Sequence, residues 1–92
     1  MAVEVRIPTI LRTFTGGEKA IEGAGVTLAQ VIDDVDTRHP GLKSRLVEAE
    51  SLRRFVNVYV NDEDVRFSGG LEAPTADGDI VVVLPAVAGG AA

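Results

Sequence analysis

The sequence predicts an α+β fold, in which a mixed sheet of four to five strands carries one main helix packed on one face. Three observations lead to this expectation. Two segments alternate apolar and polar residues, as strands with one buried face do. One segment between them has the apolar stripe of a helix, and a last segment, 80–84, is apolar on both faces. With 92 residues, the chain can build one domain around one modest core.

The first strand is expected over 3–7, where apolar and charged residues alternate until Pro8 ends the pattern. Segment 15–18 reads TGGE and has turn chemistry, because its two glycines can adopt positive φ. Segment 19–23 can therefore pair back on the first strand as a hairpin.

The main helix is expected over 27–38, because four apolar residues recur at helical spacing: Leu28, Val31, Ile32 and Val35. Thr27 and Gln30 have the spacing of a capping box, and Pro40 follows the last turn. A short helical turn is expected near 42–47, with a loop after it.

The next clear strand is expected over 55–61, with Val56, Val58 and Val60 on one face and Phe55, Asn57, Tyr59 and Asn61 on the other. After it come a turn at 61–64, at most a short strand within 65–70, and a turn at 74–79. This order is typical of a β-grasp, or ubiquitin-like, domain. In such a domain the first and last strands are parallel neighbours and the helix makes the crossover between them.

Composition excludes several classes of function. The formal net charge of −5 repels phosphate backbones and anionic lipid surfaces, so neither nucleic acid nor a membrane is expected as a partner. The absence of cysteine excludes disulfides, thiolate metal ligands and a nucleophilic thiol. The first residues, MAVEVRIPTI, lack the basic and apolar regions of a signal peptide, so the cytoplasm is the expected location.

No residue pattern predicts a catalytic or metal site, and the chain is not expected to be an enzyme. His39 follows the main helix, where an imidazolium favours the helix dipole. Asp33, Asp34 and Asp36 lie off the apolar stripe and are expected to face solvent. The serines have no histidine at a spacing that would activate them.

The C-terminal sequence LPAVAGGAA offers a different chemistry, which needs only a carboxylate and access to it. We expect a domain over 1–88 and a flexible tail over 89–92. Gly89 and Gly90 have no Cβ, so a tail ending there could thread a narrow channel, with Ala88 before it. A terminus of small residues that does nothing remains the alternative.

Three blocks carry a resemblance: IPTILR at 7–12, RFVNVYVNDEDVRFSGGL at 54–71, and LPAVAGG at 84–90. On these blocks the chain resembles the ThiS/MoaD family of sulfur carrier proteins, and within it the carriers of thiocarboxylate-dependent cysteine biosynthesis. The resemblance implies that an ATP-using, E1-like enzyme adenylates the Gly90 carboxylate, which is then converted to a thiocarboxylate. It implies no bound cofactor on the chain itself.

The resemblance also implies two further partners, a pyridoxal-phosphate cysteine synthase that uses O-phosphoserine and a zinc-dependent peptidase. Ala91 and Ala92 follow the Gly-Gly pair, so we expect cleavage between Gly90 and Ala91 to expose the working carboxylate. A tail shared among several enzymes favours a monomer.

Partners are expected to dock on a sheet face that carries Phe55, Tyr59, Val81 and Val83. Two other functions remain open. The chain could donate sulfur to a thiosugar, to molybdopterin or to a thiazole, or it could be a β-grasp binding module with an idle tail.

Overall fold

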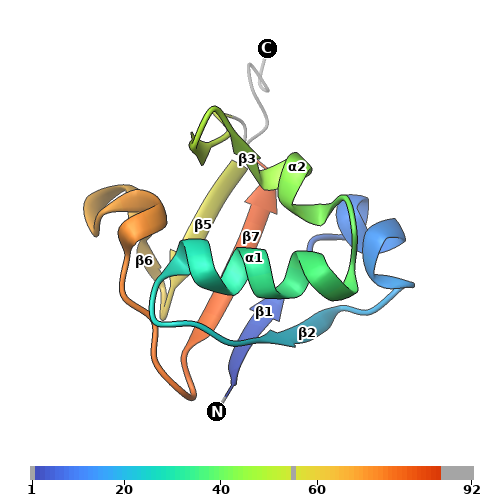
Figure 1. Ribbon diagram of the computed structural model, residues 1–92, viewed down its shortest axis with the longest axis horizontal. Coiled ribbons are helices and arrows are strands. Elements are labelled where there is room, and N and C mark those ends of the chain that lie inside the picture. Colours follow the sequence, from blue (N-terminus) through green and yellow to red (C-terminus); the bar gives the residue numbers. More distant parts are fainter. Residues whose placement is uncertain (1, 55, 86–92) are drawn as a thin grey trace.

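The computed structural model describes residues 2–54 and 56–85, which form a sheet with one long helix across it (Figure 1). The strand order in the five-stranded sheet is β2-β1-β7-β5-β6. The bounds of these strands are β1 Val3–Arg6, β2 Ala20–Gly23, β5 Val56–Val60, β6 Glu63–Asp64 and β7 Ile80–Pro85. The long helix, α1, spans Leu28–Arg38, and the short α2 spans Leu42–Leu46. The predicted fold class is therefore confirmed.

The centre of the sheet is the parallel pair β1 and β7, as the sequence predicts. Val5 lies beside Val81, and Arg6 beside Val82, in the register of this pair. β2 and β5 flank the pair and run antiparallel to it. A parallel pair needs a long connection, and α1 lies within that connection and covers one face of the sheet (Figure 1).

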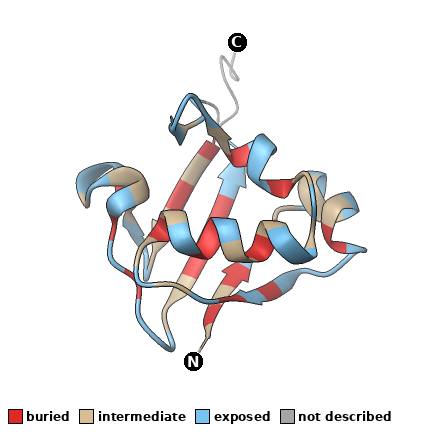
Figure 2. Ribbon diagram, viewed as in Figure 1, coloured by how far each residue is buried: buried red, intermediate tan, exposed pale blue. Residues whose placement is uncertain are grey.

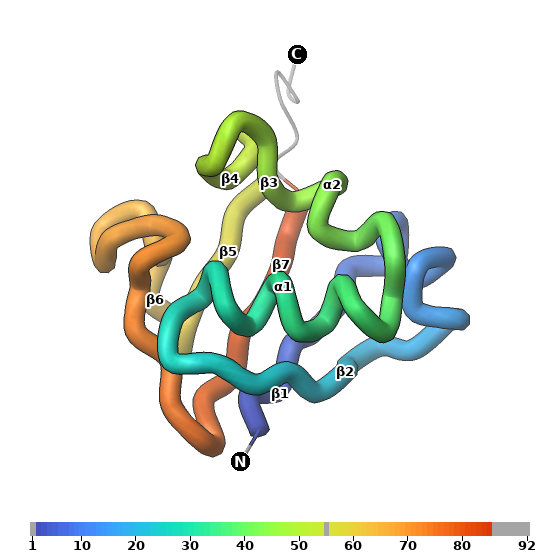
Figure 3. The backbone as a smooth tube through the Cα atoms, in the orientation of Figure 1, coloured from blue at the N-terminus to red at the C-terminus, as the bar shows by residue number. Residues whose placement is uncertain are grey.

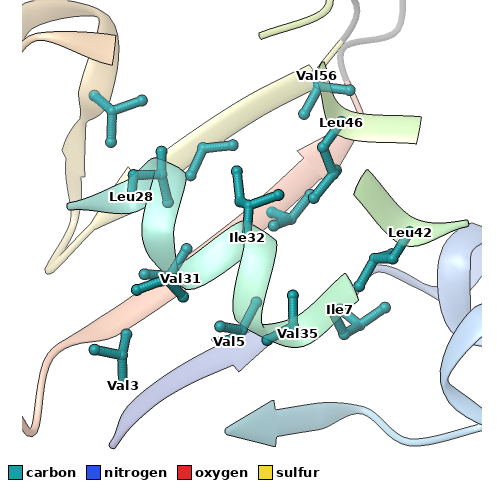
Figure 4. Close-up of a cluster of buried hydrophobic side chains, with 14 of the residues drawn as sticks. Val3, Val5, Ile7, Leu28, Val31, Ile32, Val35, Leu42, Leu46 and Val56 are labelled. Atoms are coloured by element: carbon teal, nitrogen blue, oxygen red, sulfur yellow. The ribbon is translucent and has the colours of Figure 1, made fainter. Parts of the chain in front are cut away.

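The hydrophobic core lies between α1 and the face of the sheet that it covers (Figure 4). Every second residue of the central strands points into it, while the apolar stripe of α1 closes it from above. The fully buried members include Val3, Leu28, Val31, Val35, Leu42, Leu46, Val58, Val65 and Val81. Figure 2 shows the resulting alternation of buried and more exposed positions along the strands.

The start of α1 is capped almost as predicted. The Thr27 hydroxyl accepts a hydrogen bond from the backbone N–H of Gln30, at 3.3 Å. The Gln30 side-chain oxygen reaches back to the N–H of Val26, at 2.9 Å, rather than to that of Thr27. The two bonds fix the path by which the chain enters the helix.

Several local elements differ from the sequence prediction. A 3₁₀ helix, η1 at Thr9–Thr15, lies between β1 and β2, and Gly16 and Gly17 then turn the chain with positive φ. The segment expected to be a loop after α2 forms a small hairpin, β3 Val47–Glu48 with β4 Ser51–Leu52. The segment expected to hold at most a short strand forms two 3₁₀ turns, η2 Val65–Phe67 and η3 Gly70–Glu72.

Candidate functional site

The end of β7 is the place from which the C-terminal residues depart. Pro85 is its last residue and pairs with Val56 at the start of β5. Because β1 and β7 are parallel, the last residues of β1 lie at the same end of the sheet as the last residues of β7. The tube view places the β3–β4 hairpin and α2 near this end of the sheet too, while the start of β1 lies at the opposite end (Figure 3). A partner that binds the C-terminal residues would contact this end of the sheet first.

Most residues of the predicted reactive end lie outside the described residues. They are Ala88, Gly89, Gly90, Ala91 and Ala92, and Phe55 of the predicted interface is outside them as well. The boundary expected at residue 88 also falls there. The roles assigned to these residues stay predictions.

Two of the predicted interface residues lie on the face of the sheet that α1 covers, not on the face of Tyr59 as predicted. Val81 and Val83 are only 1% and 3% exposed and belong to the core under α1. The register explains this, because Val81 lies beside Val5 and opposite Val60, and paired residues point to the same face.

Tyr59, by contrast, lies on the face away from α1, as predicted, and is half-buried. Val82 pairs with Tyr59 on this face, and Leu84 pairs with Asn57. Leu84 is 45% exposed although it is a large aliphatic residue in a central strand. We call Tyr59, Val82 and Leu84 the outer strip; its apolar side chains sit where a protein partner could bury them.

Arg66 joins the outer side of the sheet to the η2 turn. Its guanidinium donates to the side-chain oxygen of Asn57 and, at 2.8 Å, to the backbone oxygen of Val56. The Asp64 carboxylate in turn accepts from the N–H of Arg66, at 2.9 Å. Arg66 thereby holds the start of β5, where Val56 pairs with Pro85. Sequence spacing does not predict these contacts of Arg66, because Arg66 and Val56 come from different elements.

The acidic residues of α1 have structural partners rather than a metal-binding arrangement. Asp34 pairs with Arg38 at 3.0 Å and accepts from the N–H of Ala24, and both contacts lower the pKa of its carboxyl, the hydrogen bond from Arg38 most. Asp36 accepts from the N–H groups of Gly41 and Lys43. His39 occupies the C-cap, as predicted.

Two further properties of residues 2–54 and 56–85 bear on the kind of site. Within these ranges no cluster of three or more histidine, cysteine or acidic side chains could hold a metal ion. No helix there has the length and hydrophobicity needed to span a bilayer.

The helix-covered mixed sheet with a central parallel pair defines a β-grasp protein. The model of the ThiS family matches residues 5–90, and the chain belongs to this family. It is 57% identical over 93 aligned residues to the sulfur carrier protein CysO of Mycobacterium tuberculosis, covering 98% of this chain and 100% of that protein. The resemblance to the ThiS/MoaD family is thereby confirmed.

Solved structures agree with this assignment. The crystal structure of M. tuberculosis CysO superposes with a TM-score of 0.88 at 56% identity, covering 92% of this chain and 99% of that one. A chain of the Amycolatopsis orientalis BexX/CysO complex superposes with a TM-score of 0.92 at 66% identity, covering 94% and 97%. The chain is thus a homologue of sulfur carrier proteins, which are small carriers and not catalysts.

Proposed function

We propose that this chain carries sulfur as a thiocarboxylate on Gly90 and donates it for cysteine biosynthesis. In this proposal a zinc-dependent peptidase first removes Ala91 and Ala92. An E1-like enzyme then adenylates the Gly90 carboxylate with ATP. A pyridoxal-phosphate synthase that uses O-phosphoserine accepts the sulfur, and peptidase cleavage releases cysteine.

The activation step has a simple chemical reason. A free carboxylate is a poor electrophile, so its oxygen first attacks the α-phosphate of ATP and pyrophosphate leaves. Sulfide then attacks the acyl carbon of the adenylate, a C–S bond forms, and the C–O bond to AMP breaks. The product keeps sulfur in a nucleophilic form on a protein that the next enzyme can recognise. None of these steps needs a catalytic side chain on the carrier.

The observation that carries the proposal is the match of the ThiS family to residues 5–90, which ends at Gly90 and leaves Ala91 and Ala92 outside. The fold supports it, because β7 is a central strand that pairs with β1 as far as Val82 and with β5 as far as Pro85. Only 86–90 separate this rigid strand from the Gly90 carboxylate in the sequence. The high identity to CysO supports the cysteine branch.

We propose the outer strip as the docking face for these enzymes, in place of the face that includes Val81 and Val83. Tyr59, Val82 and Leu84 lie on the same side of the sheet, and two of them belong to the strand that leads to the tail. An enzyme bound here would hold the last strand while it acts on Gly90. The domain contact is needed, since fixing the backbone of five residues in one conformation costs about 1–2 kcal/mol each.

Intact-mass measurement tests the proposed function. The full-length chain is incubated with extract of its source organism, ATP, sulfide and O-phosphoserine. We expect loss of both alanines, then exchange of one oxygen for sulfur, then a carrier that has gained one cysteine residue. A full-length mass that stays unchanged, in an extract that processes a control carrier, contradicts the proposal.

The intact-mass experiment tests the first alternative, and a deletion variant tests the second. A thiocarboxylate that forms but never gains cysteine would assign the sulfur to another acceptor, such as a thiosugar, molybdopterin or a thiazole. A binding module with an idle tail would keep its partner affinity and its cellular role after deletion of 88–92, whereas the carrier would take up no sulfur.

A further inference from the structure

A groove of about 320 Å³ opens beside the outer strip, between the end of β1, the start of β2 and the outer side of β7. Its apolar lining includes Pro8, Ala20, Val82 and Leu84. Its charged part comes from three cations: Arg6, Arg12 and Lys19. We call these seven residues the basic groove.

Two of the basic residues of the groove, Arg12 and Lys19, form hydrogen bonds with the backbone at the end of β1. The side chain of Arg12 donates from Nε to the backbone oxygen of Ile7, at 3.0 Å. The N–H of Ile7 in turn donates to the backbone oxygen of Lys19, at 2.8 Å, so Lys19 is anchored beside the same residue. These bonds fix the Arg12 side chain and the Lys19 backbone beside Ile7.

Arg12 and Lys19 differ from Arg6 in their charge balance. Arg6 pairs with Glu4 at 2.7 Å, which neutralises it locally. Within the described part of the chain, neither Arg12 nor Lys19 forms an ion pair. Arg12 and Lys19 therefore bring positive charge next to the aliphatic residues of the groove, on a protein with a net charge of −5.

The acidic residues lie mostly elsewhere, several of them at the opposite end of the sheet. Asp62 belongs to the β5–β6 turn, Glu63 begins β6, and Asp77 and Asp79 precede β7. The three cations of the basic groove therefore create a locally positive field at the end of the sheet from which the tail leaves. Such a field orients an approaching partner and favours acidic side chains at the groove.

We propose that the basic groove binds an acidic segment of the E1-like enzyme, with carboxylates for Arg12 and Lys19 and an apolar side chain against Val82 and Leu84. This inference rests on the proposed function. Activation is the step in which the tail offers only a bare carboxylate, so recognition there must come mainly from the folded domain. The groove adjoins the strand that leads to that carboxylate and supplies both charge and apolar contact.

The test compares two lysine reversals that change the net charge equally, Lys19→Glu in the groove and Lys43→Glu on α2. Lys43 pairs with Asp33 on the helix-covered side of the domain, at an exposed position where an ion pair contributes little. Thiocarboxylate formation on the full-length chain is followed by intact mass with the purified E1-like enzyme and trimming peptidase of the source organism. Circular dichroism checks that both variants fold.

We expect Lys19→Glu to raise the KM for the carrier on the order of tenfold at low salt, with little change in kcat, and Lys43→Glu to resemble the wild type. The difference should shrink as salt is added. Equal KM values for the two variants would overturn the groove assignment while leaving the proposed function intact. Wild-type chain that never takes up sulfur would overturn both.

A second copy of the chain is the other occupant that the test can detect. If Lys19→Glu changes the sedimentation of the carrier and leaves its KM unchanged, the groove is a contact between copies and the proposal fails.

Discussion

Neighbouring residues of β7 belong to opposite faces of the sheet and have different roles. Val81 and Val83 lie in the core beneath α1, whereas Val82 is half-buried and Leu84 is 45% exposed on the outer side. All four are aliphatic, so side-chain type does not separate the two sets; the register with β1 and β5 does. The inner set stabilises the fold, and the outer set is free to bind a partner.

The largest effect is expected when an aspartate is placed on each face of β7 in turn. Val81→Asp buries an unpaired carboxylate among aliphatic side chains, so we expect a loss of at least about 4 kcal/mol in the free energy of unfolding. Val82→Asp, with the same change in strand propensity, should lose about 1 kcal/mol or less. Urea unfolding followed by circular dichroism measures both. Similar losses in the two variants would contradict the face assignment.

A second test concerns how closely the chain approaches α1 on the inner side. A Cβ at Gly25 would lie 2.6 Å from Cβ of Gln30 and 2.8 Å from the backbone nitrogen of Val31. Gly25→Ala must therefore displace the start of α1, and we expect a loss of about 1–3 kcal/mol. Thermal unfolding measures this loss, and a melting temperature equal to that of the wild type would show that the helix packs less tightly than described.

A third test targets the outer strip. Leu84→Asp removes exposed apolar surface, so the free energy of unfolding should change by less than about 1 kcal/mol. If the outer strip is the docking face, thiocarboxylate formation by the E1-like enzyme should fall about tenfold or more at limiting carrier concentration. The control is Val26→Asp, since Val26 is 67% exposed but lies before α1 and is not part of the outer strip. Equal activity in the two variants would remove the outer strip from the interface.

The smallest effect is expected at the edge of the sheet, where Asp34 and Arg38 cover β2. Arg38 donates to the backbone oxygen of Glu22, and Asp34 accepts from the N–H of Ala24. The pKa of Asp34 is lowered in the folded state, so its carboxylate stabilises the fold above its ordinary pKa. This contribution disappears as the pH falls through the lower, folded-state value.

Asp34→Asn provides the measurement for that edge. The variant keeps an oxygen for the N–H of Ala24 but loses the charge, so it should be slightly less stable than the wild type at neutral pH. The difference should vanish in strong acid, where the wild-type carboxyl is protonated as well. A gap between the two proteins that widens as the pH falls would contradict the stated direction of the pKa shift.

The order of the main elements could be predicted from the sequence because each has a clear period. Residues 27–38 have a helical stripe, and the strands at 3–7 and 55–61 alternate, so their inner faces could be assigned without a structure. The parallel pairing of β1 with β7 followed from this order and the crossover helix. These predictions rest on local pattern and on general rules of chain connection.

The remaining features depend on contacts between distant segments. The run IVVVL is apolar at every position, so its period could not show which residues face the core, and Val81 and Val83 were placed wrongly. The basic groove joins residues of β1, η1, β2 and β7, and no sequence spacing links them. The 3₁₀ turns and the β3–β4 hairpin are short and lack a repeating pattern.

The central claim is that Gly90 is the working end of the carrier, and two forms of the chain test it most directly. One ends at Gly90 and the other at Ala92, and each is incubated with the purified E1-like enzyme, ATP and sulfide without the peptidase. Intact mass should show one oxygen exchanged for sulfur only in the chain that ends at Gly90. Sulfur uptake by both forms, or by neither, would contradict the account.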